Sequence, residues 1–179
     1  MTHPDIVSAL EDLALIDHHV HGALRIELDR EGLEEVMTES DRPRRAGTSN
    51  FDSQFGLAVR KFCAPILGLE EFASPEDYVA VRQALGAREV NTRFLRSARL
   101  GAMIIDTGFA TSNLTDLAET AELSGVPTFE IVRLEAVAEQ LAREGVSAEG
   151  FANGVRRVLD DARAAGAVGT KSSPLIATD

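Results

Sequence analysis

Histidine side chains cluster near the start of the chain. Three of the four histidines, His18, His19 and His21, fall within four consecutive positions of the segment Ala14–Gly22. If this apolar run forms a β-strand, alternate side chains face opposite ways, so Asp17, His19 and His21 share one face. Neutral imidazole is a common metal ligand, and a strand holds two such rings in a fixed relation. The spacing therefore predicts a divalent metal site with His19 and His21 as two of its ligands.

Two imidazoles alone do not complete a catalytic metal site. A catalytic zinc ion usually has about three protein ligands and one open position for water. An isolated His-x-His sequence is also compatible with a solvated group of histidines at the end of a strand. The alignment with Asp17 favours the metal site, and the remaining ligands are expected from other parts of the chain.

Strands and helices alternate in the second half of the sequence. Short apolar runs predict strands at 102–106, 128–134 and 167–171, in addition to the first strand at the histidine segment. Between them, helical patterns at 115–124, 135–144 and 147–166 each close on a glycine or follow a capping residue. This order predicts an α/β fold in which parallel strands are joined by right-handed crossovers.

A long helical excursion separates the first strand from the second. Apolar spacing predicts helices around 28–37 and 51–66, with an irregular polar loop at 38–50 between them. Ser74 followed by Pro75 marks the start of another helix, which ends at Gly86 and is followed by one more. We therefore expect one domain over 1–179 with a helical insertion at 22–99.

Polar residues stand where each predicted strand ends. In parallel α/β folds, ligands bind beyond the carboxyl ends of the strands. His19 and His21 would share that edge with Asp106, Arg133, Glu135 and Lys171. Each of these has a plainer interpretation, such as a turn, a helix-entry ion pair or a solvated surface residue. Together they predict one site, in which Asp106, Arg133 and Glu135 contact a small-molecule substrate.

Composition excludes several classes of function. The net charge of -11 argues against nucleic-acid binding, which needs clustered basic residues. No apolar segment is long enough to cross a bilayer, and the first ten residues do not resemble a secretion signal. Cys63 is the single cysteine and stands among apolar residues, which indicates a structural thiol and a cytoplasmic protein.

The segment Ile16–His21 resembles the first-strand metal motif of the amidohydrolase superfamily, in particular the amidohydrolase-related group that includes the N-terminal domain of FluG-type proteins. Weaker resemblance extends over 38–41, 51–54, 103–108, 133–135 and 169–171. The resemblance implies a (β/α)8 TIM barrel that holds one or two divalent ions, typically zinc. It implies His19 and His21 as ligands, and Lys171 as a carbamylated ligand that bridges two ions.

The same resemblance implies an activity. Members of the superfamily use metal-activated water to hydrolyse amides or other carbon–nitrogen bonds. Their remaining ligands, two histidines and an aspartate, come from the fifth, sixth and eighth strands. A barrel of this kind needs about 250 residues, so we expect this chain to be the first half, about four β/α units, and inactive alone. The expected partner is a missing C-terminal half or another copy of the chain.

Two alternatives stay open. Some single-metal relatives perform non-hydrolytic decarboxylation with the same first-strand histidines, so a metal-dependent decarboxylase is the second enzyme hypothesis. The third hypothesis is a non-catalytic association module, because half a barrel leaves strand edges and apolar side chains exposed.

Overall fold

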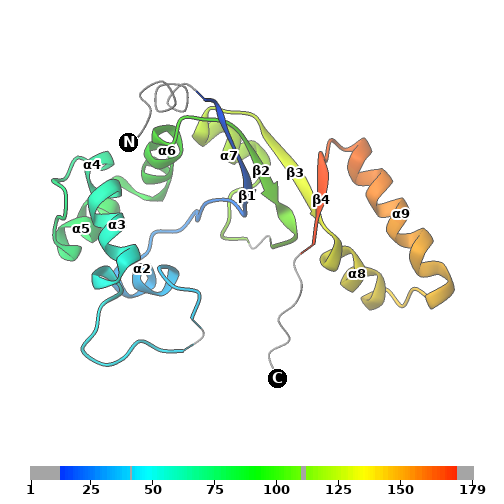
Figure 1. Cartoon of the computed structure of the whole chain (residues 1–179), viewed down its shortest axis with the longest axis horizontal. Helices are drawn as coiled ribbons and strands as arrows, with labels where there is room; N and C mark the ends of the chain where they lie inside the picture. Colours follow the sequence, from blue (N-terminus) through cyan, green and yellow to red (C-terminus); the bar gives the residue numbers. More distant parts are fainter. Residues whose placement is uncertain (1–12, 41, 110–111, 173–179) are drawn as a thin grey trace, which may run out of the picture. The chain divides into compact units, whose positions relative to one another are not determined.

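The computed structural model describes residues 13–40, 42–109 and 112–172 (Figure 1). The chain divides into two compact units. We call residues 1–23 and 99–179 the sheet unit, and residues 24–98 the helical unit. The helical unit corresponds closely to the excursion expected at 22–99; its status as an insertion in a single barrel domain stays a prediction.

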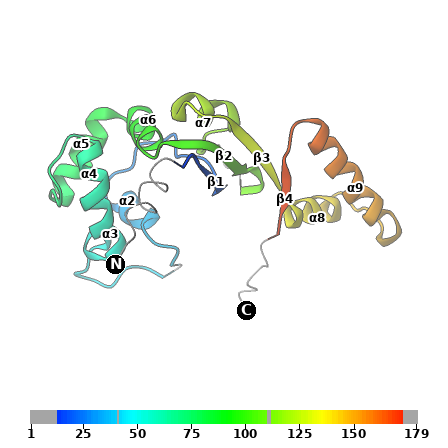
Figure 2. The ribbon, with the colours of Figure 1, turned by 45° about the horizontal axis from the view of Figure 1, so that its top comes forward.

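The sheet unit is built on four parallel strands in the order β1-β2-β3-β4 (Figures 1 and 2). The strands are β1 (Leu15–Val20), β2 (Leu100–Asp106), β3 (Thr128–Arg133) and β4 (Gly169–Lys171). The connections contain η3 (Thr107–Phe109, a 3₁₀ turn), α7 (Leu117–Ser124), α8 (Leu134–Arg143) and α9 (Ala148–Ala164). The predicted α/β class and the parallel sheet are confirmed, and the sheet is that of a half-barrel.

Capping residues determine where the helices of the sheet unit begin. Ser147 Oγ accepts a hydrogen bond from the backbone N–H of Gly150 at 3.3 Å, as expected for the start of α9. The cap of α7 is Asp116, whose carboxylate accepts from Glu119 N–H at 2.9 Å. The helix predicted from Thr115 therefore begins two residues later, because Asp116 is the stronger capping residue.

The two faces of the sheet differ in burial. Met103 and Ile105 point to one face and are each only 2% exposed. The opposite face carries Ile104 and Phe129, which are paired in register, and Phe129 is 39% exposed. We call this second face the site face, because Asp106, Arg133 and Lys171 lie on it by the same alternation. Phe129 on the site face is therefore less buried than Met103 and Ile105 on the opposite face.

An irregularity in β1 changes the expected alternation. Asp17 pairs with Met103 and Val20 with Ile105, so three steps along β1 match two steps along β2. Residues in register share a face, so Asp17 lies on the face of Val20 and not on that of His19 and His21. The expected alignment of Asp17 with the two histidines is wrong. Its carboxylate instead accepts a hydrogen bond from the backbone N–H of His19 at 3.1 Å.

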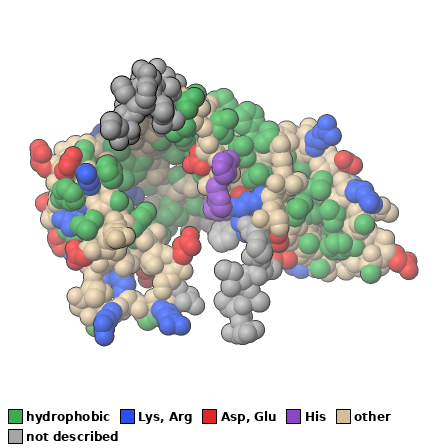
Figure 3. All heavy atoms as spheres, viewed as in Figure 1, with side chains coloured by type: hydrophobic (Ala, Val, Ile, Leu, Met, Phe, Trp, Pro, Cys, Tyr) green, Lys and Arg blue, Asp and Glu red, His purple; other side chains and the backbone are tan. Residues whose placement is uncertain are grey.

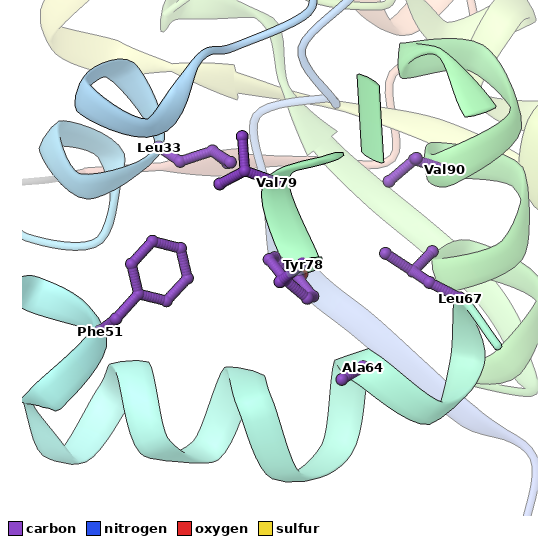
Figure 4. Close-up of a cluster of buried hydrophobic side chains, with 7 residues drawn as sticks. All are labelled: Leu33, Phe51, Ala64, Leu67, Tyr78, Val79 and Val90. Carbon is purple, nitrogen blue, oxygen red and sulfur yellow. The ribbon is translucent and has the colours of Figure 1, made fainter. Parts of the chain in front are cut away.

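The helical unit packs around its own core (Figure 4). Its elements are α2 (Arg30–Val36), η1 (Asn50–Asp52), α3 (Gln54–Ala58), η2 (Val59–Cys63), α4 (Ala64–Ile66), α5 (Pro75–Leu85) and α6 (Ala87–Ser97). Its buried side chains are Leu33, Phe51, Ala64, Leu67, Tyr78, Val79 and Val90. The rings of Phe51 and Tyr78 meet edge to face, with centroids 6.0 Å apart. Cys63 packs against this core, and burial raises the pKa of its thiol, as a structural cysteine requires.

The helix predicted over 51–66 is interrupted. It consists of the 3₁₀ turn η1, the short helix α3, a π-helical turn η2 and the short helix α4. Ser53 starts α3 by accepting a hydrogen bond from Gly56 N–H at 3.0 Å. Pro65 lacks an N–H and its ring crowds the carbonyl four residues earlier, which disfavours a regular α-helix there. Apolar periodicity alone did not reveal these breaks.

A buried carboxylate organises the loop after α2. Glu34 is 2% exposed. It accepts hydrogen bonds from Arg30 Nε at 3.1 Å and from Asn50 N–H at 2.8 Å, and Arg44 Nη1 lies 2.9 Å from it. The predicted irregular loop is confirmed in the described residues of 38–49, and Glu34 anchors it. Across the described ranges, no helix combines the length and apolarity that crossing a bilayer requires.

Candidate metal site

Five of the sequence-predicted site residues meet at the carboxyl end of the sheet. They are His19, His21, Asp106, Arg133 and Lys171, as their contacts below show. The pairing of the strands explains this: Arg133 lies beside Lys171, and Asp106 beside Ile131, two residues before Arg133. Figure 3 shows histidine side chains on the surface next to basic side chains. These five side chains therefore lie together at one edge of the sheet, as expected.

Asp106 lies at the centre of this group. Its side chain has no exposed surface. The Oδ2 atom accepts hydrogen bonds from Arg133 Nε at 2.9 Å and Nη2 at 2.6 Å, and Lys171 Nζ lies 3.2 Å away. The Oδ1 atom accepts from Gly108 N–H at 3.0 Å. One buried carboxylate thus binds two cations and a backbone amide.

These contacts determine the ionisation of Asp106. Burial by itself would raise the pKa of the carboxyl group. The hydrogen bonds and charges of Arg133 and Lys171 oppose this effect and hold the pKa below its ordinary value. Asp106 is therefore a carboxylate at neutral pH.

Lys171 connects the carboxylate to the histidines. Its Nζ lies 3.0 Å from Nε2 of His19, while the rings of His19 and His21 meet edge to face with centroids 5.6 Å apart. The side chain of Lys171 is 13% exposed. The ammonium group lies against an imidazole nitrogen and a carboxylate oxygen, which are two types of atom that bind cations.

His21 also contacts Asp106. Its Nδ1 lies 3.4 Å from the carbonyl oxygen of Asp106 and 3.7 Å from Oδ2. In the tautomer with the proton on Nδ1, this nitrogen faces acceptors and Nε2 carries the lone pair that binds metals. Metal-binding histidines commonly donate their second N–H to a carbonyl or carboxylate in this manner. The surroundings of His21 thus fit a metal ligand.

The fit to a metal ion is partial. No group of three or more His, Cys, Asp or Glu side chains arranged to hold an ion occurs within the described part of the chain. The sequence-predicted metal ligands at this edge are two imidazoles and one lysine. A neutral or carbamylated lysine would add a donor, whereas an ammonium group would not.

The backbone after His21 is held close to Thr115. Ala23 N–H donates to Thr115 Oγ1 at 2.9 Å, and Thr115 N–H donates to the carbonyl of Ala23 at 2.8 Å. Gly22 has φ +98°, and a Cβ there would lie 2.6 Å from the carbonyl oxygen of Thr115. Glycine is therefore required directly after the second histidine, where both the backbone conformation and the available space exclude a side chain.

Two further carboxylates contact residues that directly follow strands of the sheet. Glu135, in the first turn of α8, accepts a hydrogen bond from Ser172 Oγ at 2.5 Å, so it contacts the residue after Lys171. Glu130 accepts from Thr107 Oγ1 at 2.5 Å. The sequence identified Glu135 as a candidate; it did not identify Glu130 or Ser172, whose contacts depend on strand register.

The sequence matches no protein-family model, and comparison with curated proteins finds no match. Among solved structures, the chain is similar to the crystal structure of a "putative metal-dependent hydrolase" from Lactobacillus casei ATCC 334. The two share 26% sequence identity with a TM-score of 0.64. The match covers 92% of this chain but 43% of the Lactobacillus protein, so this chain spans less than half of that protein's length.

Proposed function

We propose that this chain carries part of the active site of a metal-dependent hydrolase. The observation that carries the proposal is the meeting of His19, His21 and Lys171 at one end of a parallel sheet, with Lys171 Nζ 3.0 Å from His19 Nε2. The likeness to the structure described as a "putative metal-dependent hydrolase" supports the same function. In this proposal His19, His21 and Lys171 hold the metal.

The proposal extends to the class of reaction. The resemblance of the first strand to the amidohydrolase superfamily favours a (β/α)8 barrel, a zinc ion and hydrolysis of an amide or other carbon–nitrogen bond. A divalent ion held there would acidify water and polarise a carbonyl group. Lys171 would need to lose its positive charge to act as a ligand, and carbamylation by CO₂ would turn it into an anionic oxygen donor.

Arg133 and Glu135 are the proposed contacts for a small-molecule substrate. Arg133 has a side chain that is 18% exposed, and its guanidinium group suits a carboxylate. Glu135 begins the helix that follows β3 directly. Both lie at the edge where the strands end, as substrate-binding residues do in this architecture.

The remaining metal ligands are proposed to come from a partner. The match covers 43% of the Lactobacillus protein, and residues that correspond to the rest of that protein are the proposed source of these ligands. A second copy of this chain is the other partner that would cover the site face. The exposed Phe129 on that face supports either partner.

A non-catalytic association module is the second candidate function. Two observations favour it: the site face leaves Phe129 exposed, and the described residues contain no complete group of metal-binding side chains. In such a module the polar group around Asp106 would stabilise the sheet without binding an ion.

Zinc binding by the whole chain separates the two candidates. Isothermal titration with zinc should show one class of site in the wild type. His19→Ala and His21→Ala should each weaken it by more than the roughly 10- to 100-fold loss typical when a residue that hydrogen-bonds to a metal ligand is replaced. His18→Ala is the matched control from the same strand and should leave the affinity unchanged. Zinc binding that is absent, or equally affected by all three substitutions, contradicts the hydrolase proposal.

A further inference from the structure

We propose that Asp106 is a positioning residue of the metal site and makes no contact with substrate. Its buried carboxylate lies 3.2 Å from Lys171 Nζ, which in turn contacts His19, and 3.7 Å from Nδ1 of His21. This inference rests on the proposed function, because it takes His19, His21 and Lys171 as the metal ligands. The contacts that support it are those of the ammonium form of Lys171, and a carbamylated Lys171 would keep one N–H to donate to Asp106. It gives Asp106 a role different from the substrate contact expected from its place at a strand end.

Burial excludes direct contact with a ligand that enters from solvent. Asp106 is 0% exposed, whereas His21 retains 32% of its side-chain surface and Arg133 retains 18%. A substrate at this edge therefore meets His21 or Arg133 before it could reach the carboxylate. Any effect of Asp106 on a ligand must pass through the side chains that it holds.

The contacts of Asp106 constrain its carboxylate closely. Two N–H groups of Arg133 and the ammonium group of Lys171 converge on Oδ2, while Gly108 N–H binds Oδ1. A Cβ on Gly108 would lie 2.8 Å from Cβ of Arg133, so the turn after β2 packs directly on the arginine. With both oxygens bound, the carboxylate has little freedom to rotate, and Lys171 has a fixed acceptor.

This arrangement directs Lys171 toward His19. The ammonium group donates hydrogen bonds only, and it meets one acceptor at Asp106 Oδ2, 3.2 Å away, and another at His19 Nε2, 3.0 Å away. Without the negative charge of Asp106, Arg133 and Lys171 would repel each other as neighbours across the β3–β4 ladder. We expect the lysine side chain then to swing into solvent and leave the histidines.

The lysine content of the chain provides a direct test. Lys61 and Lys171 are the two lysines of the sequence. Lys61 is exposed, whereas the side chain of Lys171 is 13% exposed. Trace acetylation followed by mass spectrometry therefore reports how well Lys171 is held, with Lys61 as an internal standard. In the wild type we expect Lys171 to react more slowly than Lys61.

Asp106→Asn should raise the Lys171-to-Lys61 labelling ratio by about tenfold, the factor expected when a hydrogen bond between charged groups is lost. Thr107→Val is the matched control, because it removes the neighbouring hydrogen bond to Glu130 and leaves Asp106 intact. It should not change the ratio. Circular dichroism of each variant at the labelling temperature verifies that the fold is retained.

A ratio in Asp106→Asn that equals the wild-type ratio overturns the inference, as does an equal increase in folded Thr107→Val. Zinc titration of the same proteins separates this from failure of the proposed function. If the wild type binds zinc and Asp106→Asn binds it with unchanged affinity, Asp106 does not position the ligands. If the wild type binds no zinc, the proposed function fails, while the labelling ratio still decides whether Asp106 holds Lys171.

Discussion

Lys171 Nζ lies 3.0 Å from Nε2 of His19, a residue that precedes it by 152 positions. The two side chains come from the outer strands β4 and β1, and two further strands lie between these. In a flat sheet, three spacings of about 4.8 Å would separate the outer strands by about 14 Å. The contact therefore indicates that the sheet curves toward the site face, as in part of a barrel.

Lys171→Met should lower the free energy of unfolding by about 2 kcal/mol, since a charged hydrogen bond to a buried carboxylate is lost. Urea unfolding of the whole chain measures the change. Lys61→Met is the matched control: Lys61 is exposed over the ring of Phe62, and its loss should cost less than about 0.5 kcal/mol. Equal effects of the two substitutions would contradict the geometry described for Lys171.

Gly22→Ala should destabilise the protein by about 2 kcal/mol or more, since both a positive φ and a clash with the carbonyl of Thr115 oppose a side chain. Gly125→Ala is the control, because Gly125 also has a positive φ but has open space around the position of a Cβ. The difference between their thermal unfolding free energies isolates the clash. The resonances of the His21 ring should shift in Gly22→Ala alone; unshifted resonances would contradict a coupling between Gly22 and the site.

Glu34→Gln should remove about 3 kcal/mol of stability at neutral pH, because it leaves Arg30 and Arg44 facing a neutral amide. Burial would raise the pKa of Glu34, but hydrogen bonds from Asn50 and Arg30 lower it overall. A lowered pKa in the folded state means that the stabilisation is present above the unfolded-state pKa and is lost as pH falls through the folded-state pKa.

The unfolding free energies of the wild type and Glu34→Gln should therefore converge in acid. Denaturant titrations over a series of pH values test this. Glu76→Gln serves as the control, since Glu76 also pairs with Arg30 but its side chain is 66% exposed, and exposed pairs of this kind contribute little to stability. A constant difference between the wild type and Glu34→Gln at all pH values would show that Glu34 is not ionised in the folded protein.

Phe129→Ser should reduce self-association of the chain. Phe129 is 39% exposed on the site face, where a partner would cover it. Sedimentation velocity over a concentration series measures the effect. Phe55→Ser, which removes a 58% exposed ring from the helical unit, should leave the association unchanged. A wild type that sediments as a monomer at every concentration would exclude a second copy as the partner.

Local signals in the sequence predicted much of the fold. Ser74 and Ser147 cap their helices, and Asp77 N–H and Gly150 N–H donate to them as expected. The four parallel strands follow from short apolar runs between helical segments. The irregularity in β1 was not predictable, because it depends on how Asp17 and Val20 align with a strand more than eighty residues away.

The candidate site, like the fold, was predictable only in part. Residue type and position at strand ends identified His19, His21 and Lys171, whose proximity the structure shows. The partner of Arg133 was not predictable: the sequence allowed a helix-entry ion pair or a contact with substrate, whereas the structure pairs it with Asp106. The pairing of Arg133 with Asp106 depends on the register of β2 against β3, and no local sequence pattern determines that register.

The division of the chain into two units has a consequence for synthesis on the ribosome. The helical unit is one continuous stretch, so its core can form as soon as residue 98 has emerged. β1 is made earlier, yet its partner β2 begins at Leu100. The nascent chain must therefore carry Leu15 and Ile16 unpaired throughout translation of the helical unit, and this interval is where chaperones or aggregation would compete for the strand.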